Sequence, residues 1–200
     1  ARSFETRFPF LKDMPRSAGL EGYLFPDTYR VLRGNPPEQI IIRLLENFND
    51  KLTSDLKKEV QRQNKSLFEI IVMASLLEKE VVSDKDRALV SGILWKRIKL
   101  DIPLQVDAAI IYGKNDELGM RNNKSGKISL KDTRIDSPYN TYQRKGLPIG
   151  PIANPGLSAI RAAIFPARSP YLYYLSARDG RTIFSKTLDE HNAAKTKYLQ

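Results

Sequence analysis

The sequence predicts a helix-rich α+β fold, with a small antiparallel β-hairpin and long ordered loops. Three observations predict it. Apolar residues recur at helical spacing through most of residues 37–98. The strongest strand signal, an aromatic run followed by a β-branched one, comes late, on either side of an Asp179-Gly180 turn. Prolines and glycines interrupt most of the remaining chain. We therefore expect several helices ahead of one late hairpin.

The length and the uniform composition favour a single domain. Two hundred residues with 41% hydrophobic content can bury one substantial core, or one core and a small appendage. No internal repeat and no low-complexity linker divides the chain. We therefore treat residues 1–200 as a single domain. The start at Ala1, without an initiator methionine, suggests a fragment of a longer protein.

The first elements follow from helix breakers and helix periodicity. Residues 1–36 are rich in proline, glycine and aromatic side chains, and Gly22 and Pro26 forbid a regular helix there. We expect an ordered aromatic loop with short extended pieces. A helix follows over residues 37–63, and it can break near residues 53–55.

The next helix, over about residues 66–82, carries two carboxylates near its end. Ser66 and Glu69 form an S-x-x-E capping box that fixes its start. On a helical wheel Glu80 lies beside the centre of the apolar face, whereas Glu78 lies at its margin. A carboxyl among apolar neighbours has a raised pKa and can act as a general acid. The alternative is that both are surface glutamates near a loop.

The middle of the chain reads as one more helix and then irregular segments. Ser83 caps a helix whose apolar residues continue to Ile98. Residues 102–112 form a short apolar segment with Pro103 and β-branched side chains. Residues 113–136 are polar and predict a long loop or short hairpin over the surface.

The last quarter contains an irregular run and then regular elements. Residues 137–156 hold too many prolines and glycines for a core helix or central strand. A helix is expected at about 157–164, strands at 171–175 and 182–184, and a final helix from about Leu188.

Composition excludes several kinds of site. The chain lacks cysteine and has a single histidine, His191, so thiol chemistry and a histidine metal site are not expected. No phosphate-binding glycine loop and no G-x-S-x-G elbow is present, and we expect no cofactor and no metal. The sequence has no run of eighteen apolar residues, so it predicts no membrane-spanning helix in these 200 residues. The net charge of +10 suits an anionic partner or general solubility, and no nucleic-acid motif accompanies it, so nucleic acid is not an expected partner.

The loop after residue 136 has the composition of a carbohydrate-binding segment. Aromatic faces stack on sugar rings, and amides and hydroxyls pair with sugar hydroxyl groups. The candidate substrate-binding residues are Tyr139, Asn140, Thr141 and Tyr142, together with Gln105 and Asp107 from the segment after the third helix. The alternative is a structural loop whose side chains cap neighbouring helices, and simple turn chemistry at Gln105 and Asp107.

Several segments, in order, resemble the endolytic murein transglycosylases of the YceG-like family. They are Leu20-Glu-Gly-Tyr-Leu-Phe-Pro-Asp-Thr-Tyr29, Ala74-Ser-Leu-Leu-Glu-Lys-Glu80, Leu104-Gln-Val-Asp107 with Ile111-Tyr112-Gly113, Ser137-Pro-Tyr-Asn-Thr-Tyr142, Gly146-Leu-Pro-Ile-Gly-Pro-Ile-Ala-Asn-Pro-Gly156, Tyr171-Leu-Tyr-Tyr174, and Phe184-Ser-Lys-Thr187 with Glu190-His-Asn192. Together they span about residues 20–192. Two departures are Ala108-Ala109 after Asp107, where the family has Pro-Thr, and Ile149 for a proline. A third is Thr182, which stands where the family has a histidine.

The resemblance implies a membrane-anchored enzyme that acts on nascent peptidoglycan outside the cytoplasmic membrane. It would cleave the MurNAc–GlcNAc β-1,4 bond within glycan strands and leave 1,6-anhydro-MurNAc ends, with Glu80 as the catalytic acid and base. Glu78 is grouped with the substrate-binding candidates, and at most it would modulate Glu80 through like-charge repulsion. The membrane anchor and a LysM-like domain would lie upstream, and cell-wall synthases (penicillin-binding proteins) are the expected partners.

Two other functions stay open from the residues alone. One is a non-catalytic glycan-binding or scaffold module of the cell-wall synthesis machinery. The other is a water-using muramidase, with Glu78 or Asp107 as a second carboxylate. A pyridoxal-dependent lyase is not supported, because no phosphate-binding site is visible.

Overall fold

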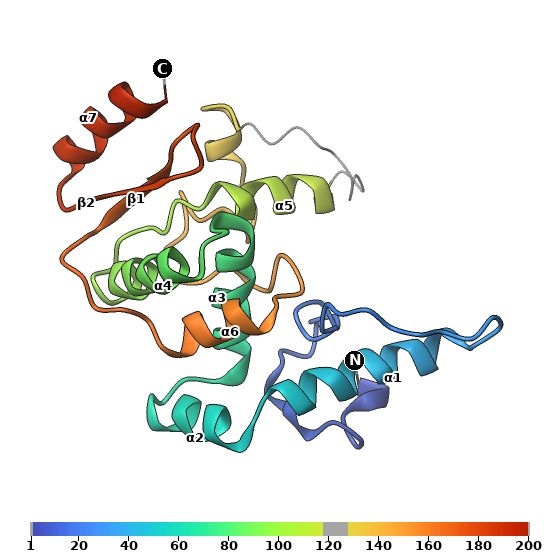
Figure 1. The fold of residues 1–200 in the computed structure, drawn as a ribbon. Helices are drawn as coiled ribbons and strands as arrows, with labels where there is room; N and C mark the ends of the chain where they lie inside the picture. Colours follow the sequence, from blue (N-terminus) through green and yellow to red (C-terminus); the bar gives the residue numbers. More distant parts are fainter. Residues whose placement is uncertain (1, 118–127, 200) are drawn as a thin grey trace.

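The computed structural model describes residues 2–117 and 128–199, and it has the predicted α+β architecture (Figure 1). The helices are α1 (Pro37–Lys51), α2 (Ser54–Arg62), α3 (Leu67–Glu80), α4 (Asp84–Lys99), α5 (Asp107–Glu117), α6 (Leu157–Ile164) and α7 (Leu188–Tyr198), with short 3-10 turns η1 (Arg2–Phe4), η2 (Pro9–Asp13) and η3 (Asp132–Arg134). The strands are β1 (Tyr173–Ser176) and β2 (Thr182–Ser185).

Helix α3 is the central element of the core. Its residues from Ile70 to Leu77 are all buried, so the helix is apolar on every side and is enclosed by its neighbours. Helices α4, α5 and α6 surround it in Figure 1. The capping box is confirmed, because Ser66 accepts a bond from the Glu69 amide at 3.1 Å and Glu69 accepts from the Ser66 amide at 2.7 Å. This enclosure makes α3 a rigid support for whatever stands at its end.

The N-terminal region packs a loop tightly against that core. Residues 21–36 contain no regular helix, as predicted, and the break between α1 and α2 falls at Leu52-Thr53. Gly22 has a φ of +91°, and a Cβ there would lie 2.6 Å from Cγ2 of Ile71 and 2.7 Å from Cγ of Pro151. Only glycine fits this conformation and this contact. The loop is thereby seated between α3 and the segment before α6.

The late hairpin is confirmed, with α7 against it. β1 and β2 pair antiparallel, with Tyr174 opposite Phe184 and Ser176 opposite Thr182. A second capping box, between Thr187 and Glu190, starts α7. In Figure 1 the hairpin and α7 lie together at one end of the molecule, beyond the end of α3.

Helix α5 departs from the expected pattern. Residues 113–117 lie in this helix, so the loop or hairpin predicted over 113–136 is wrong there, and residues 118–127 lie outside the described part. The misleading signal is Gly113. A Cβ at this position would lie 2.7 Å from Oγ of Ser137 and 2.9 Å from Cβ of Tyr139. The glycine therefore permits close packing within a helix, and it does not mark a turn.

Residues 137–156 form irregular chain, as predicted. Ser75, in the middle of α3, accepts a bond from the Ile152 amide at 3.0 Å. Asn154 accepts from the amides of Gly22 at 2.7 Å and Leu24 at 3.3 Å. This segment is thus bonded on one side to α3 and on the other to the N-terminal loop. Within the described residues, no helix combines the length and apolar character needed to cross a membrane.

Candidate active site

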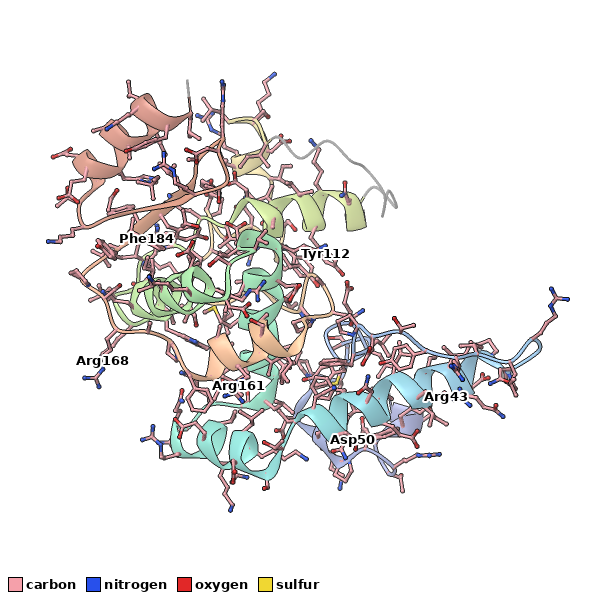
Figure 2. The ribbon with its side chains drawn as sticks, viewed as in Figure 1. Arg43, Asp50, Tyr112, Arg161, Arg168 and Phe184 are labelled. Atoms are coloured by element: carbon pink, nitrogen blue, oxygen red, sulfur yellow. The ribbon has the colours of Figure 1, made fainter. Side chains whose placement is uncertain are left out.

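Glu80 is the last residue of α3, and its carboxyl group lies between the hairpin and α5. The side chain is partly buried, and the Tyr174 hydroxyl donates a hydrogen bond to its Oε2 at 3.0 Å. The backbone of Ala108, in α5, also bonds to the carboxylate. Figure 2 marks Phe184 on β2 and Tyr112 on α5, which lie on either side of the end of α3. Three elements distant in sequence therefore meet at this carboxyl.

Burial is the main reason that Glu80 has an unusual acidity. Desolvation raises its pKa from 4.5 to about 7, and the negative charge of Asp107 adds to the rise. The hydrogen bonds from Tyr174 and Ala108 oppose the shift. Tyr174 has its own pKa raised by burial and by the adjacent Glu80 charge, so it remains a hydrogen-bond donor. A carboxyl with a pKa near neutrality can both give and take a proton at physiological pH.

The chain leaving α3 is fixed by a buried arginine. Arg87 donates to the carbonyl oxygen of Val81 from Nε at 3.2 Å and from Nη2 at 2.9 Å. Its Nη1 bonds to Ser158 at 2.6 Å and to Asp84 at 2.7 Å. This clamp ties the residue after Glu80 to both α4 and α6.

Asp107 and Tyr142 lie beside Glu80, as the sequence hypothesis required of site residues. The Tyr142 hydroxyl donates to Oδ1 of Asp107 at 2.5 Å. Burial raises the pKa of Tyr142 above its usual range, with further contributions from Asp107 and Glu80. Sequence analysis expected Glu78 to exert the like-charge effect on Glu80, but the charge that does so is Asp107. We call Glu80, Tyr174, Asp107 and Tyr142 the Glu80 cluster.

The other predicted binding residues are arranged differently. Gln105 is exposed and takes a φ of +54°, and its side-chain oxygen accepts from Arg97 at 2.8 Å. Thr141 is buried, where its Oγ1 accepts from the Val106 amide at 2.9 Å and donates to the Val106 carbonyl at 3.2 Å. The side chain of Gln105 therefore bonds to Arg97, outside the cluster, whereas Thr141 fastens the loop to the start of α5.

Asn140 is fully enclosed by its own loop. Its amide nitrogen donates to the carbonyl oxygens of Thr133 at 3.1 Å and Ile135 at 2.7 Å, and its oxygen accepts from the Tyr142 amide at 3.0 Å. Asn140 thereby sets the conformation of the chain that carries Tyr142. These bonds match the structural alternative for this residue, and direct contact with a substrate stays a prediction.

Glu78 faces a separate pocket next to the Glu80 cluster. Its Oε2 accepts a bond from the Gly156 amide at 3.1 Å, at the start of α6. The pocket has a volume of about 700 Å³ and is lined by Glu21, Pro26, Glu78, Lys79, Ala108, Ile111, Tyr112, Asn115, Ile152, Ala153 and Asn154. Ala108 connects the pocket to the cluster. It is one of the residues that line the pocket, and its backbone bonds to the Glu80 carboxylate.

An aromatic pair and a short hydrogen bond shape one wall of this pocket. The rings of Tyr112 and Tyr139 lie 4.8 Å apart at 59°. The Tyr112 hydroxyl donates to Glu21 at 2.5 Å, which joins α5 to the N-terminal loop. Tyr139 thus packs behind Tyr112, which lines the pocket. The lining thus combines apolar side chains with carboxylate, amide and hydroxyl groups.

Sequence reasoning missed Tyr174, Arg97 and Glu21 as residues of this site. Tyr174 and Glu21 lie within segments that carry the family resemblance, so that signal was available. Arg97 had no such signal, because a basic residue near the end of a helix is ordinarily solvated.

A metal site has no support in the described residues, since no group of three or more His, Asp or Glu side chains there is arranged to hold an ion.

His191 and Thr182 both lie away from the Glu80 carboxyl in the hydrogen bonds described. The ring of His191 stacks on that of Tyr173, with 5.2 Å between the ring centres. Thr182 is the first residue of β2 and pairs with Ser176, at the turn end of the hairpin.

The fold and the cluster define a class of protein: an α+β domain that presents a desolvated carboxyl beside a pocket of about 700 Å³. A family model, the YceG-like family, matches residues 3–197, and the chain belongs to this family.

Relatives of known name are similar over most of the chain. A protein of Bacillus subtilis named endolytic murein transglycosylase is 38% identical over 182 residues, which is 90% of this chain and 48% of the relative. A protein of the same name from Streptococcus pneumoniae is 34% identical over 183 residues, 91% of this chain and 33% of the relative. The chain therefore spans about half or less of these curated relatives.

A solved structure has the same fold. The crystal structure of a putative yceG-like protein from Listeria monocytogenes superposes with a TM-score of 0.84 at 35% identity. The match covers 97% of this chain and 63% of that one.

Proposed function

We propose that this chain is the catalytic region of an endolytic lytic transglycosylase of peptidoglycan. In this proposal it cleaves the MurNAc–GlcNAc β-1,4 bond within nascent glycan strands and leaves 1,6-anhydro-MurNAc ends. The observation that carries the proposal is Glu80, a carboxyl with a pKa of about 7 beside a pocket of about 700 Å³. The names of the relatives support the substrate class.

The proposed mechanism uses Glu80 twice. In its protonated form it donates the proton to the glycosidic oxygen as the C1–O bond breaks and an oxocarbenium-like centre develops. The carboxylate then accepts the proton of the C6 hydroxyl of the same MurNAc, and that oxygen attacks C1. Because the nucleophile belongs to the substrate, no water enters the product. A pKa near neutrality suits both steps, because Glu80 first gives up a proton, then accepts one from the C6 hydroxyl, and is protonated again at the end.

The neighbours of Glu80 have separate proposed roles. Tyr174 stabilises the carboxylate formed after the first step through its hydrogen bond. Asp107, held by Tyr142, places a negative charge near the developing positive centre. The pocket bordered by Ile152 and Tyr112 receives an adjoining part of the glycan.

The test is muropeptide analysis by mass spectrometry after digestion of uncrosslinked glycan strands. We expect the wild type to release anhydro ends and Glu80→Gln to release none. Glu69→Gln is the matched control, because it neutralises an exposed carboxylate at the other end of the same helix and glutamine can still accept the capping bond, and it should retain activity. Anhydro ends absent with the wild type, or undiminished in Glu80→Gln, would refute the proposal.

Muramidase activity is the second candidate, and Asp107 is the observation that favours it. A carboxylate close enough to raise the pKa of Glu80 is also placed to activate a water. A muramidase releases reducing ends, which are heavier than anhydro ends by one water. Reducing ends from the wild type that disappear in Asp107→Asn would select this activity. Binding to glycan without any cleavage would select the scaffold alternative.

We further propose that the enzyme works on the extracytoplasmic side, tethered by an upstream membrane anchor and near cell-wall synthases. The support is the family membership and the greater length of the relatives. Protease treatment of intact spheroplasts tests the location, because it should degrade this region of the full-length protein. Co-purification with penicillin-binding proteins after crosslinking tests the partnership.

A further inference from the structure

Arg97 is a buried cation at the end of α4 that the mechanism above does not use. Only 5% of its surface is exposed. Its guanidinium donates to the Pro103 carbonyl at 3.0 Å, to Oε1 of Gln105 at 2.8 Å and to the Leu172 carbonyl at 3.5 Å, and it lies 5.4 Å from the Tyr173 ring centre. All three acceptors are uncharged oxygens. Burying a cation against neutral acceptors is costly, so its presence calls for an explanation beyond surface charge.

The acceptors of Arg97 belong to the two segments that surround Glu80. Pro103 and Gln105 precede Asp107 and Ala108, whose charge and backbone act on the Glu80 carboxyl. Leu172 and Tyr173 precede Tyr174, whose hydroxyl bonds to that carboxyl. One planar guanidinium therefore spans both segments, a geometry that a lysine ammonium cannot reproduce.

Gln105 carries a second sign of this arrangement. Its φ of +54° is a conformation that favours glycine or asparagine. Its backbone amide donates to the Thr141 carbonyl at 2.9 Å, and its side chain faces Arg97. A residue with a Cβ is strained in this conformation, which points to a role for the Gln105 side chain. The need visible here is the acceptor for Arg97.

We propose that Arg97 is a positioning residue that fixes the segments carrying Asp107 and Tyr174 around Glu80. This inference rests on the proposed function for its kinetic consequences, but not for its structural ones. Asp107 is also fixed by Tyr142, and Val106 by Thr141. Tyr174 lies on a two-stranded hairpin, so its contact with Glu80 depends more strongly on Arg97.

The charges around Glu80 set the direction of the effect. Tyr174 faces it from β1 and Asp107 from α5, Tyr142 lies next to Asp107, and the Arg97 charge lowers the pKa of both tyrosines. A lysine here keeps the positive charge but loses the fork that bonds both segments, so Tyr174 is held less firmly and its hydrogen bond to Glu80 weakens. The carboxylate of Glu80 then loses stabilisation, and its pKa rises.

The experiment compares Arg97→Lys with Lys96→Gln. Lys96 also donates to carbonyls of the segment before β1, those of Ser169 and, at 2.9 Å, Tyr171, but it contacts neither Gln105 nor Leu172 in the described bonds. The Glu80 pKa is measured in the free protein by carbon-13 NMR of its carboxyl, and kcat and KM are measured on soluble glycan strands. We expect Arg97→Lys to raise the pKa by about half a unit or more and to lower kcat about tenfold. Lys96→Gln should leave both nearly unchanged.

A folded Arg97→Lys with the wild-type pKa and kcat would overturn the inference. If Arg97→Lys does not fold, Gln105→Met decides, because its site is exposed. A several-fold lower kcat at constant KM supports positioning, whereas a raised KM at constant kcat marks Gln105 as a substrate contact and overturns it. If the wild type releases no anhydro ends, the proposed function fails while the NMR comparison still tests Arg97.

Discussion

Replacing Glu80 by glutamine should stabilise the protein at alkaline pH while abolishing cleavage. The pKa of Glu80 rises from 4.5 to about 7 on folding, so the folded state binds the proton more tightly than the unfolded chain does. Stability is therefore lost as pH rises through this window. A shift of this size corresponds to about 3 kcal/mol in the free energy of unfolding, at about 1.4 kcal/mol per unit. Glutamine has the same shape and does not titrate in this range.

The assay is urea unfolding of wild type and Glu80→Gln at several values between pH 4 and pH 8.5. We expect little difference at pH 4, where the carboxyl is protonated, and a gain of about 2–3 kcal/mol for the variant near pH 8. Glu78→Gln is the control, because it neutralises a carboxylate on the same helix while its amide oxygen can still accept from the Gly156 amide, so it should show no comparable gain at pH 8. A Glu80→Gln difference that does not change with pH would refute a desolvated Glu80.

Three further predictions concern the neighbours of Glu80 and the seat of the N-terminal loop. Tyr174→Phe removes a donor that lowers the pKa of Glu80, so the alkaline limb of kcat/KM against pH should move up by about one unit. Asp107→Asn removes a negative charge that raises the pKa of Glu80, so the alkaline limb should move to lower pH. The same alkaline limb in Tyr174→Phe and Asp107→Asn would contradict the opposite effects assigned to these two residues. Gly22→Ala should cost about 2–4 kcal/mol by urea unfolding, because its Cβ overlaps two neighbours. Gly34→Ala, at a φ of +90° with open space around it, should cost about 1 kcal/mol, and equal losses would count against tight seating.

Local patterns predicted most of the elements because those elements depend on local interactions. The capping boxes at Ser66 and Thr187 satisfy backbone groups within one turn, and the hairpin turn at Gly180 needs a positive φ that glycine supplies. Helix α5 escaped prediction because the reason for Gly113 lies outside its own segment, at Ser137 and Tyr139. A glycine required by close packing has the same appearance in a sequence as a glycine required by a turn.

In the candidate site, too, local patterns predicted only what depends on local interactions. The sequence by itself predicted that most of α3 is buried and that Glu80 lies nearer the centre of its apolar face than Glu78, because helical periodicity fixes those directions. Only the tertiary structure decided which groups meet Glu80. Tyr174, whose hydroxyl bonds to Glu80, lies 94 positions from it in the sequence. The negative charge that helps to raise the pKa of Glu80 belongs to Asp107. Desolvation and charge–charge interaction act through space between segments remote in sequence, so no local pattern records them.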